Sequence, residues 1–303
     1  MWALDTPPGT GAKATAMTLV RPVAGFARDD KKSPDPLARL LALGRPVVMG
    51  VLNVTPDSFS DGGRFLDPAA AIAQARRMIA EGADVLDVGA ESTRPYGGAV
   101  AVPIAEEMRR LASVLPTVVA LGVPVSIDTM KAEVAAWALA EGAAIVNDVW
   151  GLQRDGELAR VVAERAVPVI IMHNREAADP SIDIIADMSA FFSRSLDIAA
   201  RAGIARQNIV LDPGIGFGKT PEQSLTAIAR LSELRSFGLP LLVGASRKRF
   251  IDKVSPAPPD QRLGGTIAAH VLAVAGGAAI IRTHDVAETV QALRVAAAIG
   301  SAR

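Results

Sequence analysis

Polar and charged side chains recur at the ends of short apolar segments along this sequence. Asp128 and Asp212 each close a run of aliphatic and β-branched residues, where a buried carboxylate costs free energy unless a partner or a substrate compensates it. If these segments are parallel strands of one barrel, the side chains at their ends meet at a common mouth. The residues in such positions are Asn53, Asp87, Asp128, Asn147, Asp148, His173, Asp212, Lys248, Arg282 and His284. Their mixture of acids, amides and cations indicates a binding or catalytic site.

Each of these residues also has a simpler interpretation, because buried polar groups are normally satisfied by local hydrogen bonds. We expect a functional role for Asp128, Asp212 and Lys248, since the cost of burying such groups recurs around one mouth. Both roles stay open for Asp87 and Asp148. His173 is left out of the predicted site, because one backbone carbonyl satisfies a neutral histidine.

Cations concentrate after the seventh and eighth apolar segments. Ser246-Arg247-Lys248 stands at the start of a predicted helix, and Arg282-Thr283-His284 precedes the last one. Backbone N–H groups at helix starts and nearby cations both favour an oxyanion, and phosphate is often bound at this corner of a barrel. We therefore predict that an anionic group of the substrate binds here.

The sixth apolar segment leads into a glycine-spaced turn, residues 211–219, with the sequence LDPGIGFGK. Glycines let the backbone approach a flat ligand closely, and Phe217 offers an apolar or stacking face. The turn is suited to a planar heterocycle. A flexible loop with no binding role can have the same glycine spacing, so the spacing does not decide between the two. Trp137 and Trp150 are interpreted as packing residues.

Eight apolar segments, spaced on the order of 35 residues apart, alternate with Ala- and Leu-rich amphipathic segments. The predicted helices include residues 68–81 and 131–141, and glycines stand where helices should end, at positions 82, 122, 142, 203 and 238. The predicted strands are residues 47–54, 83–89, 124–128, 144–148, 168–173, 209–212, 240–245 and 278–283. Eight such units predict an α/β fold, a (β/α)₈ TIM barrel. A doubly wound open sheet is the alternative, but residues 53–63 lack its GxGxxG fingerprint.

The chain has 303 residues, of which 50% are hydrophobic and 21% charged, with a formal net charge of zero. We predict a single barrel domain over residues 46–303 and an N-terminal extension over residues 1–45, of which residues 15–25 could plug the bottom of the barrel. The balanced charge argues against nucleic acid or a membrane surface as a partner. No cysteine is present, which excludes disulfides and thiolate chemistry and fits a cytoplasmic protein. The longest apolar run, residues 268–281, is too short to span a membrane.

Residues 49–63, MGVLNVTPDSFSDGG, resemble the first signature of the dihydropteroate synthase family. Residues 87–95, 211–220, 246–248 and 282–284 resemble its later motifs, so the resemblance extends from about Arg45 to the C-terminus. It implies a folate-pathway transferase that condenses 6-hydroxymethyl-7,8-dihydropterin pyrophosphate with p-aminobenzoate to give 7,8-dihydropteroate and pyrophosphate. It also implies small-molecule substrates, Mg²⁺ as cofactor, a homodimer and a target of sulfonamides.

The resemblance assigns roles to individual residues. The pterin would be bound by Asp128, Asn147, Asp212 and Lys248. The pyrophosphate would be bound by Asn53, Arg282 and His284, and Asn53 would also be a ligand of Mg²⁺. The p-aminobenzoate would be bound by Phe59, Thr93, Arg94, Pro95, Phe217 and Lys248. The catalytic residues would be Asp128, Lys248, Asp61 and Arg94. Pyrophosphate would depart first, and the amine of p-aminobenzoate would attack the resulting pterin methylene cation near Asp128.

Two positions depart from the family pattern. Tyr96 separates Arg94-Pro95 from the glycines that commonly follow directly, and Arg249 stands where many members have serine.

Three other functions remain open. The first is a corrinoid-dependent methyltransferase barrel, which would not need the cations after the last two strands. The second is a Schiff-base aldolase with Lys248 as nucleophile, which the other cations near Lys248 make less plausible. A catalytically silent pterin-binding paralogue is the third, although every predicted site position carries a competent side chain.

Overall fold

The computed structural model describes residues 35–55, 67–91 and 102–302, and the structural statements below concern these residues. Their strands are all parallel, each pairs with its neighbour in the sequence, and β8 closes against β1. The strands are β1 (Val47–Asn53), β2 (Val85–Gly89), β3 (Val125–Asp128), β4 (Ile145–Asp148), β5 (Val169–Met172), β6 (Ile209–Asp212), β7 (Leu241–Val243) and β8 (Ala278–Thr283). The predicted (β/α)₈ barrel is confirmed.

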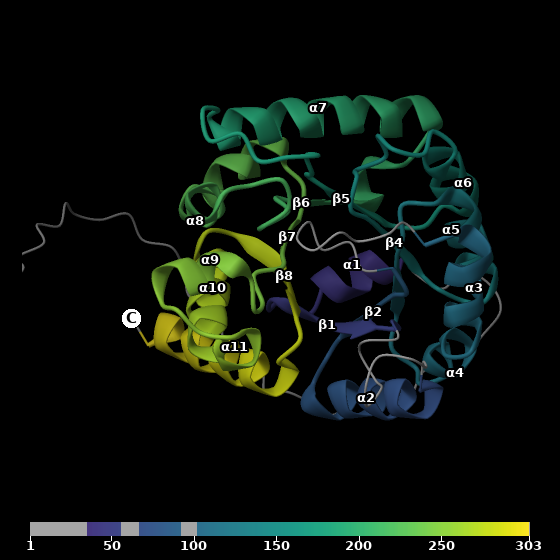
Figure 1. Cartoon of the computed structure of the whole chain (residues 1–303), viewed down its shortest axis with the longest axis horizontal. Helices are drawn as coiled ribbons and strands as arrows, with labels where there is room; N and C mark the ends of the chain where they lie inside the picture. The colour runs from purple at the N-terminus through teal and green to yellow at the C-terminus, as the bar shows by residue number, and fades with distance from the viewer. Residues whose placement is uncertain (1–34, 56–66, 92–101, 303) are drawn as a thin grey trace, which may run out of the picture.

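Helices surround the strands as a ring in the view down the barrel (Figure 1). The α-helices are α1 (Pro36–Leu41), α2 (Pro68–Glu81), α3 (Ile104–Ala112), α4 (Leu115–Val119), α5 (Ala132–Ala140), α6 (Leu158–Arg165), α7 (Ile184–Ala202), α8 (Pro221–Ala229), α9 (Arg249–Val254), α10 (Leu263–Ala275) and α11 (Val286–Ser301). Three short 3₁₀ helices join them: η2 (Arg206–Asn208), η3 (Leu231–Phe237) and η4 (Pro259–Gln261). No helix in these ranges is both long and apolar enough to cross a membrane.

The ends of the elements follow from local chemistry. Helix α2 starts where the Asp67 carboxylate accepts hydrogen bonds from two backbone N–H groups, and it ends at Gly82 in the left-handed conformation. All five glycines predicted to end helices have positive φ. Gly238 ends η3, a 3₁₀ helix. One prediction needs correction: Gly122 does not directly end a helix, because α4 stops at Val119 and Ala120 is its C-cap.

Two apolar clusters hold the barrel together. The larger lies between the strands and the surrounding helices, and the smaller fills the barrel at the N-terminal ends of the strands. Leu37 and Leu40 of α1 belong to the smaller cluster, and Figure 1 shows α1 within the ring of helices. The start of β1, where Val47 lies, is therefore covered by a segment of the predicted extension. The domain division itself stays a prediction, and residues 15–25 lie outside the described residues.

Candidate active site

Arg282 of β8 lies between two carboxylates at the mouth of the barrel. Its Nε is 2.6 Å from Asp87 Oδ2 of β2, and its Nη2 is 2.9 Å from Asp128 Oδ2 of β3. Asn147 of β4 donates to the same Asp87 oxygen at 3.0 Å. Four strands thus contribute to one hydrogen-bonded cluster, in which a single guanidinium faces two carboxylates.

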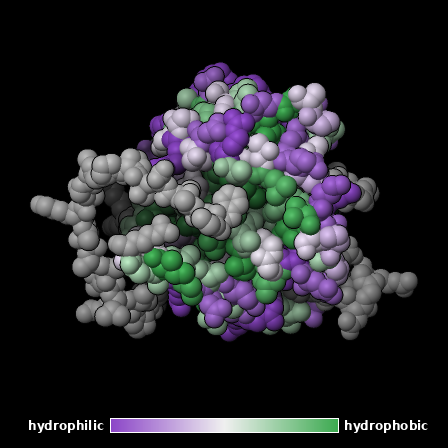
Figure 2. Space-filling model, turned by 90° about the vertical axis from the view of Figure 1, so that its left-hand side faces the viewer, coloured by the Kyte–Doolittle hydropathy of each residue, from purple (hydrophilic) through white to green (hydrophobic). Residues whose placement is uncertain are grey.

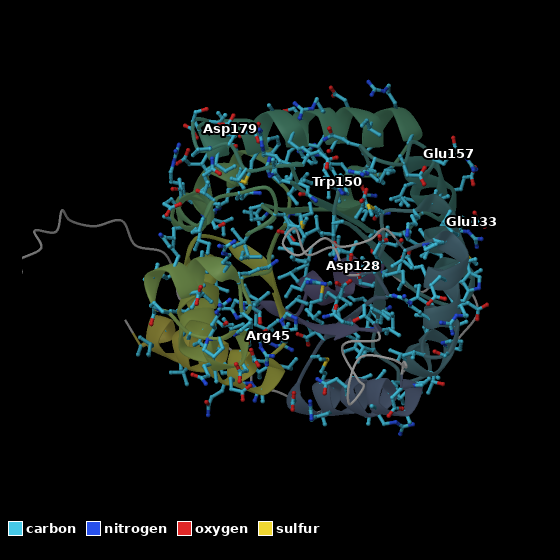
Figure 3. All side chains as sticks on the ribbon, in the orientation of Figure 1. Arg45, Asp128, Glu133, Trp150, Glu157 and Asp179 are labelled. Carbon is cyan, nitrogen blue, oxygen red and sulfur yellow. The ribbon has the colours of Figure 1, made fainter. Side chains whose placement is uncertain are left out.

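Several acceptor atoms in this cluster have no hydrogen-bond partner among the described residues. They are buried, and a buried polar atom without a partner costs about 1–3 kcal/mol. The atoms are Asp87 Oδ1, Asp128 Oδ1 and Asn147 Oδ1, and the hydroxyl oxygen of Ser126, two residues before Asp128 on β3, likewise has no partner among the described residues. A set of acceptors at the mouth of a barrel is suited to a ligand that presents several N–H donors. Figure 3 shows Asp128 near the centre of the barrel, whereas Glu133 of α5 and Glu157, just before α6, lie in the surrounding ring.

Burial changes the protonation of the two mouth carboxylates that we predicted to be functional. It raises the pKa of Asp128 to about 7, an effect that Asp87 strengthens and Arg282 opposes. Burial also raises the pKa of Asp212 to about 6, against the hydrogen bond from the backbone N–H of Gly214. The described residues therefore do not fully compensate either carboxylate, as is typical of groups in binding sites.

The turn after β6 brings together three of the predicted residues. Asp212 accepts a hydrogen bond from the backbone N–H of Gly214 at 2.8 Å. Lys248, which precedes α9, places its Nζ 4.0 Å from the centre of the Phe217 ring. Lys248 and Arg282 are both close enough to lower the pKa of Asp212. An acceptor, an aromatic face and a cation therefore line one side of the mouth.

The loops after β7 and β8, where we predicted a phosphate corner, are joined by hydrogen bonds. Ser246 Oγ accepts from the backbone N–H of His284 at 3.2 Å and lies 3.0 Å from His284 Nδ1. Arg247, a non-glycine residue with φ of 58°, is paired with Asp285. Burial and the neighbouring cations lower the pKa of His284 to about 3, so at neutral pH this side chain is an uncharged hydrogen-bonding group.

Comparison with known proteins agrees with this geometry. Residues 49–284 match the family model described as pterin binding enzyme. A Bacillus subtilis protein named dihydropteroate synthase is 45% identical over 243 residues, which cover 80% of this chain and 84% of that protein. The chain belongs to the dihydropteroate synthase family.

Solved structures of the dihydropteroate synthase family have the same architecture. The Clostridium difficile enzyme, crystallised in the presence of pteroic acid, aligns with a TM-score of 0.81 and 46% identity, covering 84% of this chain and 97% of that one. The Xanthomonas albilineans enzyme in complex with 7,8-dihydropteroate aligns with a TM-score of 0.78 and 42% identity, covering 85% and 94%. The family resemblance inferred from the sequence motifs is confirmed over most of the chain.

Some predicted residues of this dihydropteroate synthase family member lie away from the cluster around Arg282. Asn53 is the last residue of β1, is half-buried, and pairs in register with Gly89 of β2. Asp148, for which both roles stayed open, accepts hydrogen bonds from the backbone N–H groups of Trp150 and Leu152 at 2.9 and 2.6 Å, which is a structural role in the turn after β4. Five predicted residues lie outside the described residues: Phe59, Asp61, Thr93, Arg94 and Pro95.

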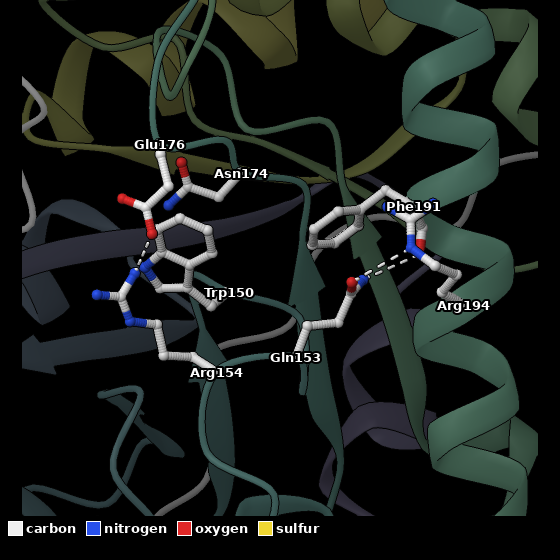
Figure 4. A pocket seen from close by; sticks show the side chains of 7 residues that line it. All are labelled: Trp150, Gln153, Arg154, Asn174, Glu176, Phe191 and Arg194. Atoms are coloured by element: carbon white, nitrogen blue, oxygen red, sulfur yellow. Dashed lines mark hydrogen bonds and ion pairs between the residues drawn. The ribbon is translucent and has the colours of Figure 1, made fainter.

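The two tryptophans differ from each other. Trp137 packs against the larger apolar cluster, as predicted. The interpretation of Trp150 as a packing residue is wrong, because its half-buried ring lines a cavity of about 420 Å³ beside α7, with the Arg154 guanidinium 4.6 Å from the ring centre (Figure 4). Arg154 is in turn paired with Glu176, so one of the cations at this cavity is already compensated.

Two lysines of this family member were missed by sequence reasoning. Lys219 is 1% exposed, and its Nζ lies 2.7 Å from Nδ1 of His173, the histidine that we left out of the predicted site. Lys131, just before α5, contacts Glu91 at 2.7 Å and the Val102 carbonyl at 2.6 Å. The sequence carries no signal for either contact, because a lysine after a strand or a glycine turn is usually solvated.

Proposed function

We propose that this protein is a dihydropteroate synthase, a transferase that condenses 6-hydroxymethyl-7,8-dihydropterin pyrophosphate with p-aminobenzoate to give 7,8-dihydropteroate and pyrophosphate. The observation that carries the proposal is the convergence of Asp128, Asn147, Asp212 and Lys248 at one mouth, with buried acceptor atoms that have no partner among the described residues. The relatives of this name, and their structures with pteroic acid and 7,8-dihydropteroate, support it.

The pterin is recognised by its pattern of donors and acceptors. Asp212 accepts two hydrogen bonds from the amino-pyrimidine edge, because a carboxylate pairs with two parallel N–H donors. Lys248 donates to the acceptor side of the ring. Asp128 and Asn147 each have a buried oxygen without a partner among the described residues, and these oxygens accept the remaining ring N–H groups.

The pyrophosphate binds beside the adjoining strands β1 and β8, where Asn53 ends β1, Arg282 lies on β8 and His284 follows it. Nε and Nη2 of Arg282 face the two carboxylates, so Nη1 is the nitrogen available to the phosphate. The uncharged His284 donates or accepts one hydrogen bond, depending on its tautomer. These residues favour the negative charge that develops on the leaving group.

The donor set also suits Mg²⁺ carried by the pyrophosphate. The described residues hold no group of three His, Cys, Asp or Glu side chains that would bind a resident metal. Mg²⁺ usually combines one or two protein oxygens with substrate phosphates and water, and Asn53 provides one amide oxygen. When bound, Mg²⁺ neutralises charge on the pyrophosphate oxygens.

The reaction is a substitution at the pterin methylene carbon. The carbon–oxygen bond breaks first and its electron pair leaves with the pyrophosphate. The carboxylate of Asp128 stabilises the resulting cation until the amine nitrogen of p-aminobenzoate attacks the methylene carbon and releases a proton to water. Phe217 and Lys248 form one wall of the p-aminobenzoate pocket. The rest comes from Phe59, Thr93, Arg94 and Pro95, with Asp61 and Arg94 assisting catalysis.

A second copy of the chain is the proposed protein partner. Figure 2 shows apolar side chains gathered on the side of the molecule formed by α8 to α11. The exposed large apolar residues of these helices are Leu225, Val254, Leu263, Leu272, Val295 and Ile299. Large exposed apolar surfaces mark interfaces, and we place the homodimer contact on this side of the molecule. We place the protein in the cytoplasm. Sedimentation of the purified protein measures its mass, and a monomer at micromolar concentration contradicts this assignment.

The test of function is product formation. Purified protein is incubated with the dihydropterin pyrophosphate, Mg²⁺ and p-aminobenzoate, and dihydropteroate is followed by chromatography alongside released pyrophosphate. We expect both products in equal amounts, with neither formed when one substrate is omitted. Binding of the pterin without product favours the silent paralogue, and borohydride trapping of a carbonyl substrate on Lys248 favours the aldolase.

A further inference from the structure

Lys219 lies behind the proposed pterin pocket, at the end of the turn that begins with Asp212. Its ammonium group is within hydrogen-bond distance of three acceptors: His173 Nδ1 at 2.7 Å, the Gly214 carbonyl at 2.9 Å and the Phe217 carbonyl at 3.1 Å. Three acceptors match the three N–H donors of an ammonium group. Burial lowers the pKa of Lys219 to about 7, whereas the charges of Asp212 and Asp187 raise it. A cation is thus enclosed within the turn and is 1% exposed.

His173 connects this cation to the neighbouring helix. The imidazole is fully buried and packs against the Phe191 ring, with ring centres 4.9 Å apart. Because Nδ1 accepts from Lys219, the proton of the neutral ring is on Nε2, which lies 2.9 Å from Asp187 Oδ2 of α7. Asp187 is also paired with Arg175 at 2.8 Å. The turn after β6 is therefore tied through His173 to the loop after β5 and to α7.

Backbone contacts show how closely the two loops approach. A Cβ atom on Gly214, which has φ of 62°, would lie 2.0 Å from the His173 carbonyl oxygen. A Cβ atom on Gly218, which has φ of 52°, would lie 2.5 Å from the Arg175 carbonyl oxygen. The His173 N–H donates to the Asp212 carbonyl at 2.9 Å. The turn has no space for larger residues here, so its shape depends on the contacts that hold it against this loop.

We propose that Lys219 is a positioning residue for the pterin: by binding the carbonyls of Gly214 and Phe217 and the ring of His173, it fixes the turn that aims the Asp212 carboxylate and the Phe217 ring. The proposal rests on the proposed function and deepens it. Lys219 acts through other groups, since its burial keeps it from the substrate.

Loss of the ammonium group has a defined consequence. His173 Nδ1 and the Phe217 carbonyl lose this donor, and the Gly214 carbonyl keeps only the Phe217 N–H, so the turn relaxes toward conformations that satisfy these acceptors. The Gly214 N–H then no longer holds Asp212 Oδ1, and the carboxylate loses the orientation needed for two parallel hydrogen bonds to the pterin. The predicted result is weaker pterin binding, beyond any loss of stability.

The experiment measures pterin binding separately from turnover. Lys219→Met, His173→Phe, His173→Asn and the double variant Lys219→Met/His173→Phe are compared with wild type. The dihydropterin pyrophosphate is titrated calorimetrically without p-aminobenzoate, and thermal unfolding of each protein is recorded. Phenylalanine keeps the ring packing but removes Nδ1, whereas the asparagine side chain keeps an acceptor near the same position. Lys253→Met, on the exposed side of α9, is the matched control.

We expect Lys219→Met and His173→Phe each to weaken pterin binding at least tenfold. The double variant should lose little more than either single variant, because both changes remove one interaction. His173→Asn should retain more affinity than His173→Phe, and Lys253→Met should bind as wild type does. A Lys219→Met protein that unfolds at a lower temperature yet binds pterin with wild-type affinity overturns the proposal.

Two other outcomes are informative. If Lys219→Met does not fold, the two His173 variants decide: equal pterin affinities for asparagine and phenylalanine at this position overturn the proposal. If wild-type protein binds the pterin but forms no dihydropteroate, the proposed function fails, whereas the affinities of the variants still test the positioning role.

Discussion

The two ends of the barrel are built from the same eight strands and have opposite chemistry. At the N-terminal end, residues such as Met49 and Ile145 form an apolar cluster with Leu37 of α1. At the C-terminal end, Asp128 and Arg282 form a cluster of buried charges. The change occurs within single strands: β6 has the sequence IVLD and becomes polar only at its last residue, and β3, with the sequence VSID, also ends in an aspartate.

The two ends of the barrel therefore have different roles: the N-terminal end mainly stabilises the fold, and the C-terminal end carries the proposed binding site. The apolar end contributes burial without polar cost, whereas the mouth contains acceptors without partners among the described residues and carboxylates with raised pKa. Such strain is typical of binding sites, where the ligand supplies the missing interactions. Changes at the mouth should therefore affect turnover more than stability, and changes at the apolar end should do the reverse.

The sharpest form of this contrast is expected at Asp212 and Lys248. Asp212→Asn keeps an acceptor for the Gly214 N–H but cannot pair with two donors, and Lys248→Met removes the cation beside Phe217. Each variant should lower kcat/KM by about a thousandfold, which is the order expected for a preorganised polar contact. Circular dichroism should be unchanged, and Asp197→Asn on the exposed face of α7 serves as control. Normal turnover by either variant contradicts the assigned pterin pocket.

Arg282 lies at the mouth, yet its replacement should also reduce stability strongly. Arg282→Met leaves the Asp87 and Asp128 carboxylates buried without their cation, which should reduce the free energy of unfolding by about 3–5 kcal/mol. The loss should be smaller at pH 5 than at pH 8, because the Asp128 carboxylate, whose pKa is raised to about 7, takes up a proton at the lower pH. Urea unfolding at the two pH values measures it. Adding Asp87→Asn and Asp128→Asn should restore part of the stability, and no restoration would contradict the charge argument.

The apolar end gives the reverse expectation. Leu37→Ala removes a buried side chain of α1 and should cost about 2–4 kcal/mol of unfolding free energy. The kcat/KM of the folded protein should stay at the wild-type value, because the mouth is at the other end of the strands. Leu43→Ala is the matched control, since Leu43 is 44% exposed. A large loss of activity in folded Leu37→Ala would show that the two ends are coupled.

The smallest expected effect is a pH dependence of stability caused by Asp212. Its pKa is raised from 3.8 to about 6 in the folded protein, so the folded state binds the proton more tightly than the unfolded chain does. Stability therefore falls as pH rises through this window, by at most about 3 kcal/mol. Asp212→Asn should be more stable than wild type at pH 8 and no more stable at pH 4, as measured by urea unfolding. A constant difference between the two pH values would contradict this.

Sequence reasoning was most successful where the information is local. Strand periodicity and helix-ending glycines determined the order of the elements, and Asp128 and Asp212 were found because a strand end places them. The partners of long side chains were not predicted. Arg282 contacts Asp87, which is 195 residues away, and the direction of its guanidinium depends on closure of the whole barrel. Lys219 was missed for the same reason, since its burial depends on the neighbouring loop.

The pairing of the first strand with the last has a consequence for biosynthesis. Met49 of β1 is in register with Arg282 of β8, so the mouth is completed only by the final strand. On the ribosome, the chain contains Asn53 and Asp128 long before Arg282 has been added. Until then, Asp128 lacks the cation that faces it in the folded barrel. Substrate binding should therefore begin only after β8 has been synthesised, and ligand binding would report on barrel closure.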